Sequence, residues 1–133
     1  MTTTLNEVST RFGFPLPTWD ELVMEGEKFL RSRQALRRLT TYTELTQVLR
    51  QRVATGQAID TGTYALGQLL VEIEERVSEP YLLTSLVTYL DDNRPGNGFY
   101  DLAAQRGLLP HGAGVDVKRT VWSDQVALAH AAV

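Results

Sequence analysis

The chain has 133 residues, of which 43% are hydrophobic and 22% charged, and this composition is typical of one globular domain. The absence of cysteine excludes disulfides, thiolate catalysis and cysteine-ligated metal sites, and no apolar run approaches the roughly 18 residues of a membrane span. The net charge of −3 indicates no general affinity for polyanions. Since the first residues lack a basic stretch followed by an apolar core, we also expect no secretory signal, no membrane association and a cytoplasmic location.

The start of the chain is expected to form an N-terminal arm, residues 1–17, ahead of a single domain that spans residues 18–133. A threonine run, a glycine and two prolines disfavour regular structure in the arm, and a short helix over residues 5–12 is an open alternative. Phe12 and Phe14 are apolar enough to pack on the body of the domain.

Three helices are predicted next, from capping boxes and from apolar residues at helical spacing. Thr18 opens the first and Thr41 the second, each with a glutamate three residues later, and Pro80 stops the third. The first helix is predicted to run from residue 18 to about 34 or 39. The second is predicted over residues 41 to about 53, and the third over residues 63 to 78.

The remainder of the chain changes in character, because residues 81–90 are rich in β-branched and aromatic side chains that favour a strand. The predicted elements are this strand, a turn at 91–98, a short helix at 99–107, an extended segment at 117–121 and a final helix at 122–132. Together the elements predict a mainly α-helical fold with a small β element, an α+β domain with one short hairpin or strand pair.

Catalytic and metal motifs are scarce. The two histidines, His111 and His130, have no cysteine to help them bind a metal, and the pair Asp91-Asp92 lies in a turn where solvated carboxylates are common. The nucleophile-elbow, P-loop and dinucleotide-binding patterns do not occur. We therefore expect a protein that is not an enzyme and that uses no cofactor or metal.

Charge is distributed unevenly. Residues 28–53 contain seven positive side chains and one acid, whereas residues 72–79 contain four glutamates and Arg76. Eleven of the thirteen basic residues are arginine, whose planar donor fork suits phosphates and carboxylates. GC-rich coding would give the same preference without any function.

The predicted order of elements, two helices, a third helix, a strand and a hairpin-like turn, is that of a winged-helix domain. In such domains the third helix directs its N-terminal residues into the major groove of DNA. At this helix, the residues that would contact bases or phosphates are Thr61, Thr63, Tyr64 and Gln68. Arg94 at the turn would reach a minor groove. The phosphate backbone of the DNA would be held by Arg37, Arg38, Arg50 and Arg52. The sequence thus predicts a DNA-binding module or regulator.

Glu72, Glu75 and Glu79 on the third helix oppose this hypothesis, because they would repel phosphates unless the helix enters by its N-terminal end. The alternative is a protein-interaction module, either an adaptor or a self-associating chain. Dimerisation would use the arm or the last helix, where Trp122, Val126 and Leu128 supply apolar surface.

The segment from Thr41 to Leu109 resembles a group of small, mostly uncharacterised bacterial and phage proteins. The matching motifs are Tyr42-Thr43-Glu44-Leu45, Leu66-Gly67-Gln68-Leu69, Pro80-Tyr81-Leu82-Leu83-Thr84-Ser85-Leu86-Val87 and Pro95-Gly96-Asn97-Gly98-Phe99. Its layout is also similar to the winged-helix domain of alkyltransferase-like DNA-repair proteins. Because their Pro-Cys-His-Arg motif is absent, the resemblance implies a DNA-binding type of fold and a bacterial or phage origin, but no alkyl transfer.

Overall fold

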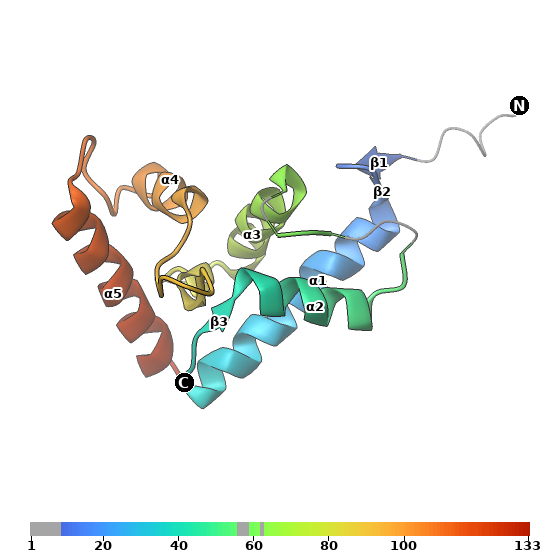
Figure 1. The fold of residues 1–133 in the computed structure, drawn as a ribbon, viewed down its shortest axis with the longest axis horizontal. Coiled ribbons are helices and arrows are strands. Elements are labelled where there is room, and N and C mark those ends of the chain that lie inside the picture. The colour runs from blue at the N-terminus through green and yellow to red at the C-terminus, as the bar shows by residue number, and fades with distance from the viewer. Residues whose placement is uncertain (1–8, 56–58, 62) are drawn as a thin grey trace, which may run out of the picture.

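A computed structural model describes residues 9–55, 59–61 and 63–133, and these form a mainly helical fold with a small β element (Figure 1), which confirms the predicted fold class. The elements are β1 (Thr10–Arg11), β2 (Phe14–Pro15), α1 (Leu16–Leu36), β3 (Thr40–Thr41), α2 (Tyr42–Arg52), α3 (Tyr64–Val77), the 3-10 helix η2 (Leu83–Leu86), β4 (Val87–Thr88), α4 (Asn97–Gln105) and α5 (Val115–Ala131). Within the described ranges, no helix combines the length and the apolar character needed to cross a membrane.

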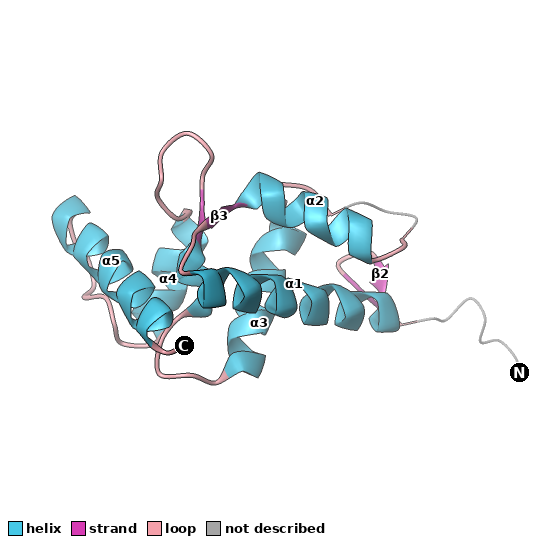
Figure 2. Cartoon of the chain, turned by 90° about the horizontal axis from the view of Figure 1, so that it is seen from below, coloured by secondary structure: helices cyan, strands magenta, loops and turns pink. Residues whose placement is uncertain are grey.

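The long helix α1 organises the core. Its 21 residues extend for about 30 Å, and α2, α3, η2 and α5 all pack against it. Figure 2 shows α3 crossing behind α1 while α2 runs along it. Gly26 makes the crossing close, since a Cβ at this position would lie 2.9 Å from Cδ1 of Ile73. Leu22, Leu30 and Leu69 are fully buried at this interface.

A second, smaller apolar cluster joins α4 to α5 and to the segment before η2. Leu82, Phe99 and Leu102 are buried in it. Two hydrogen bonds hold α5 in place, because Nε1 of Trp122 donates to the carbonyl of Ser85 at 2.8 Å and Oε1 of Gln125 accepts from the amide of Leu82 at 2.8 Å. In Figure 1, α4 accordingly lies between α3 and α5.

Capping signals place the start of α2 well but not that of α1. The hydroxyl of Thr41 accepts a hydrogen bond from the amide of Glu44 at 3.0 Å, which confirms half of the predicted capping box. The first helix, however, begins at Leu16 and not at Thr18. Pro17 fits its first turn because an amide there has no partner within the helix.

Residues 9–15 of the predicted arm contain a hairpin, in which β1 pairs antiparallel with β2, while residues 16 and 17 belong to α1. Positive φ angles at Phe12 (53°) and Gly13 (87°) make its turn. Phe14 is buried, and the ring of Phe12 lies 4.9 Å from that of Trp19 and 5.5 Å from that of Tyr64. The alternative of a helix is therefore wrong for residues 9–12, while residues 1–8 lie outside the described part.

The predicted strand over residues 81–90 is mostly wrong. Only Val87–Thr88 is a strand, and it pairs in parallel with β3, while residues 83–86 form η2. Every residue from 81 to 88 is buried, so the apolar composition reflects burial and not strand pairing. The parallel pair also differs from the hairpin that a winged helix would place after its third helix.

The last part of the chain is more helical than predicted. Residues 117–121 belong to α5, which begins at Val115, so the predicted extended segment is wrong. Val121 and Trp122 pack on the α4 cluster, and this packing overrides the weak helix propensity of the β-branched residues. The predicted short helix is present as α4, displaced by two residues from 99–107 to 97–105.

Candidate binding groove

A groove lies between α3 and α4. It consists of two adjoining cavities. We call the cavity of about 240 Å³ the inner cavity and the cavity of about 300 Å³ the outer cavity. Gly67 and Val71 of α3, together with Gly98 and Leu102 of α4, line both cavities, so the two form one continuous depression. Apolar side chains and polar groups converge along this groove in a concave shape.

Two neighbouring tyrosines line the inner cavity. The rings of Tyr42 and Tyr89 lie 5.1 Å apart, and the hydroxyl of Tyr42 accepts a hydrogen bond from the amide of Gly96 at 2.7 Å. A Cβ at Gly96 would lie 3.0 Å from the Tyr89 hydroxyl and 3.1 Å from that of Tyr42. The turn at residues 95–99 is thus held against both tyrosines and forms a wall of the cavity.

Burial at this wall favours the neutral form of Tyr42. Burial raises the pKa of Tyr42 above its ordinary value, and the hydrogen bond from Gly96 opposes that rise only in part. Tyr42 therefore presents an uncharged hydroxyl near neutral pH.

The floor of the inner cavity rests on a buried carboxyl group. Thr84 lines the cavity, and its amide donates a hydrogen bond of 2.6 Å to Oε2 of Glu74, which is fully buried. Among the described residues Oε1 of Glu74 has no hydrogen-bond partner. Burial raises the pKa of Glu74, against the hydrogen bonds from Thr84 and Leu83 that lower it, so the neutral acid is favoured.

Glu74 was counted from the sequence among the charged residues of the third helix. Its spacing four residues after Leu70 and three before Val77 places it in the apolar stripe of α3, and this was the signal available in the sequence.

Two glycines open the groove. Beyond its chain neighbours and its own helix backbone, a Cβ built at Gly67 or at Gly98 meets no described atom within 4 Å, and neither residue has a positive φ. A glycine inside a helix costs about 1 kcal/mol relative to alanine. Neither packing nor backbone geometry within the described chain requires these glycines, and their effect is to leave both helix backbones accessible from the groove.

Four of the nine residues predicted to contact DNA meet at this groove. Thr61 and Thr63 line the inner cavity, while Tyr64 and Gln68 line the outer one. Tyr64 is 72% exposed, at the outer rim. The hydroxyl of Thr63 is already engaged, because it donates to the carbonyl of Asp60 and accepts from the amide of Leu66 as the cap of α3.

The predicted arginines are not gathered at the groove, and three of them face carboxylates. Arg50 pairs with Asp60, Nη1 of Arg52 lies 3.5 Å from Oε1 of Glu25, and Nε of Arg94 lies 3.1 Å from Oδ2 of Asp92. These partners reduce the positive potential that the arginines would offer to phosphates.

Arg37 and Arg38 follow the C-terminal end of α1, and no ion pair of theirs is found in the part of the chain that the structure describes. Since α1 and α2 run antiparallel, with Arg33 paired to Glu44 at 2.6 Å, these two arginines lie near the start of α2. Arg50 and Arg52 lie near its other end, about 16 Å away along an 11-residue helix. The arginines therefore belong to separate parts of the surface.

Another set of cations surrounds Tyr100, which packs in the α4–α5 cluster. Nζ of Lys118 lies 5.4 Å above the ring of Tyr100. Burial raises the pKa of Tyr100, while the nearby charges of Arg94 and Arg119 oppose the rise. The sequence alone does not indicate Lys118 and Arg119, because only the packing of α5 on α4 brings them near Tyr100.

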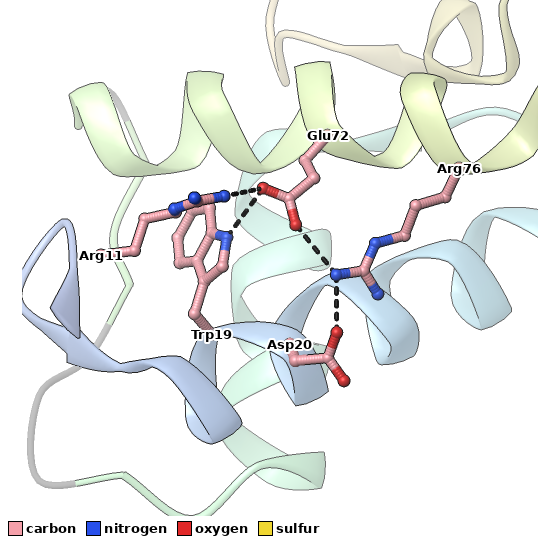
Figure 3. Close-up of polar contacts among 5 residues, drawn as sticks. All are labelled: Arg11, Trp19, Asp20, Glu72 and Arg76. Carbon is pink, nitrogen blue, oxygen red and sulfur yellow. Dashed lines mark hydrogen bonds and ion pairs between the residues drawn. The ribbon is translucent and has the colours of Figure 1, made fainter. Parts of the chain in front are cut away.

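A polar network fixes α3, one wall of the groove, to α1 and the hairpin (Figure 3). Arg11 and Trp19 donate to Oε1 of Glu72 at 2.9 and 3.0 Å, and Arg76 donates to Oε2 of Glu72 at 2.9 Å and to Asp20 at 2.6 Å. Partial burial alone would raise the pKa of Glu72, but the hydrogen bonds from Trp19, Arg76 and Arg11 together hold it below its usual value. The sequence predicts Glu72 on a free acidic face of the third helix, whereas in the structure its carboxylate is paired with Arg11, Trp19 and Arg76.

Metal-binding geometry is absent from the described ranges, where no group of three or more His, Cys, Asp or Glu side chains could hold an ion. Comparison with known proteins finds no matching family profile, no matching curated protein and no matching solved structure. The resemblance to alkyltransferase-like domains stays a prediction.

Proposed function

We propose that this chain is a non-enzymatic protein-interaction module and that the groove between α3 and α4 binds a segment of a partner protein. The observation that carries the proposal is the pair Gly67 and Gly98, which line both cavities and at which an added Cβ would point into open space. A glycine in a helix lowers the stability of the helix. Since neither glycine is needed for packing within the chain, the close approach of a partner chain explains its presence.

The lining of the inner cavity, whose volume is about 240 Å³, favours an apolar side chain. Leu66, Leu70 and Phe99 provide apolar walls, with the neutral hydroxyl of Tyr42 among the lining groups. An apolar or aromatic side chain on a partner segment satisfies this lining, because it would bury the apolar walls without stranding a charge.

The proposal is tested by selecting random peptides displayed on phage against the immobilised chain, followed by affinity measurements with purified peptides. Gly67→Leu places a side chain in both cavities and is expected to weaken binding by at least about tenfold, which corresponds to about 1.4 kcal/mol. The matched control is Ala127→Leu, an exposed position on α5, which should bind as the wild type does. Failure to select peptides, or equal binding by Gly67→Leu, would refute the groove.

DNA binding is the second candidate, and one observation favours it. Nζ of Lys118 lies over the ring of Tyr100, and the charges of Arg94 and Arg119 act on the same tyrosine, so these cations would attract phosphates. A fluorescently labelled DNA duplex at low salt tests this candidate by anisotropy. Salt-sensitive binding that is lost in a Lys118→Ala/Arg119→Ala variant would support it, and no binding by the wild type would end it.

A further inference from the structure

The outer cavity differs from the inner one in its polar groups. Asp101 and Gln105 lie one turn apart on α4 and line this cavity together with Gln68 of α3. The adjoining walls are the apolar side chains of Val71 and Leu102. The cavity thus combines an apolar surface with one carboxylate and two amides.

Asp101 has an unusual status among the aspartates near the groove. Asp60 and Asp92 each face an arginine, as described above, whereas no ion pair of Asp101 is found within the described ranges. Its carboxylate is exposed and borders a concave surface. Nearby on α3, Glu75 is also exposed, while the guanidinium of Arg106, which follows Gln105, acts on the neighbouring Glu74. The charges of Lys118, Arg94 and Arg119 act instead on Tyr100.

A lysine or arginine side chain fits both properties at once. Such side chains bury their aliphatic stems along apolar surface while the charged end stays at the rim. The amide oxygens of Gln68 and Gln105 are additional acceptors for its N–H groups. An acidic segment or a phosphate would instead meet the charge of Asp101 and be repelled.

We propose that the groove recognises a basic, apolar partner segment, in which a lysine or arginine lies against Asp101 while a neighbouring large apolar side chain fills the inner cavity. The proposal rests on the proposed function and adds the chemistry of the partner. Charge complementarity at the outer cavity selects the cation, and the tyrosine-lined inner cavity selects the apolar neighbour.

The test uses the phage-selected peptides. We expect them to be enriched in lysine or arginine at a fixed offset from a large apolar residue. Replacing that lysine by the uncharged isostere norleucine, or introducing Asp101→Asn, should each weaken binding by about fivefold, as is typical of a partly exposed charge pair. Combining both changes should cause little further loss, since each removes the same interaction.

Charge reversal separates this pair from a general effect of net charge. Asp101→Lys should restore binding of a peptide whose lysine is replaced by glutamate, while the matched reversal Asp116→Lys, at the start of α5 and outside the cavity lining, should not. The inference on partner chemistry is overturned if the selected peptides contain no lysine or arginine and bind Asp101→Asn as well as the wild type. If Gly67→Leu still blocks these peptides, the proposal that the groove binds a partner is retained. If no peptide is selected, both proposals fail.

Discussion

The indole Nε1 of Trp19 donates a hydrogen bond of 3.0 Å to Oε1 of Glu72, and this contact connects the first helix to the third across 53 positions of sequence. The same carboxylate also accepts hydrogen bonds from Arg11 and Arg76. One glutamate therefore determines how the hairpin, α1 and α3 meet, and it does so one turn beyond the groove residue Gln68.

Replacing this carboxylate should destabilise the fold. We expect Glu72→Gln to lower the free energy of unfolding by about 1–2 kcal/mol, because charge-assisted hydrogen bonds from a partly buried indole and two guanidinium groups are lost. Urea denaturation near neutral pH measures the change. Glu75→Gln, an exposed position on the same helix, is the control and should alter stability very little.

The pH dependence of this contribution has a defined sign. Since the folded pKa of Glu72 is below the ordinary value of 4.5, its contribution to stability is full above that value and is lost as the pH falls through the folded pKa. The difference between wild type and Glu72→Gln should therefore disappear in acid. A difference that stays constant in acid would show that the carboxylate charge is not the cause.

Glu74, two residues away, should behave in the opposite way. Its folded pKa is raised by burial, so the wild type loses stability as the pH rises from 4.5 through the folded pKa. Glu74→Gln imitates the neutral acid and should be more stable than the wild type near neutral pH, by about 1 kcal/mol. Denaturation midpoints at acidic and neutral pH measure this, and an equal difference at both would contradict the assignment.

The wall of the inner cavity provides a third test. We expect Gly96→Ala to destabilise the chain by about 1–3 kcal/mol, because its Cβ would crowd the hydroxyls of Tyr42 and Tyr89. Gly98→Ala, two residues on in α4, meets no described atom within 4 Å beyond its chain neighbours and its own helix backbone, and should be neutral or slightly stabilising. Thermal unfolding of the two variants measures the contrast, and similar losses in both would mean that the tyrosines do not constrain the turn.

Local signals in the sequence predict the helices because caps and apolar periodicity act within a few residues. The hydroxyls of Thr41 and Thr63 cap α2 and α3, close to where the sequence places their starts. The fold class follows from the number and length of such segments. The segment 81–88 misleads, because burial from all sides produces the same residue types as a strand does.

The site depends on contacts that no local pattern encodes. Pairing of Arg52 with Glu25 requires α1 and α2 to be antiparallel, and Lys118 lies over the ring of Tyr100 only because α5 folds onto α4. The sequence does indicate Tyr64 and Gln68 at the start of the third helix, and these line the groove. The opposing wall, Asp101 included, is placed there by tertiary packing.

The central claim, that the surface between α3 and α4 is where a partner binds, is tested most directly by nuclear magnetic resonance of the isotope-labelled chain. Amide signals are followed while a phage-selected peptide is added. The account predicts that the amides of Gly67, Gly98 and Leu102 shift most, with saturation at the affinity measured for the same peptide. Shifts confined to residues around Arg37 and Arg38, or around Lys118, would contradict it and place the binding surface elsewhere.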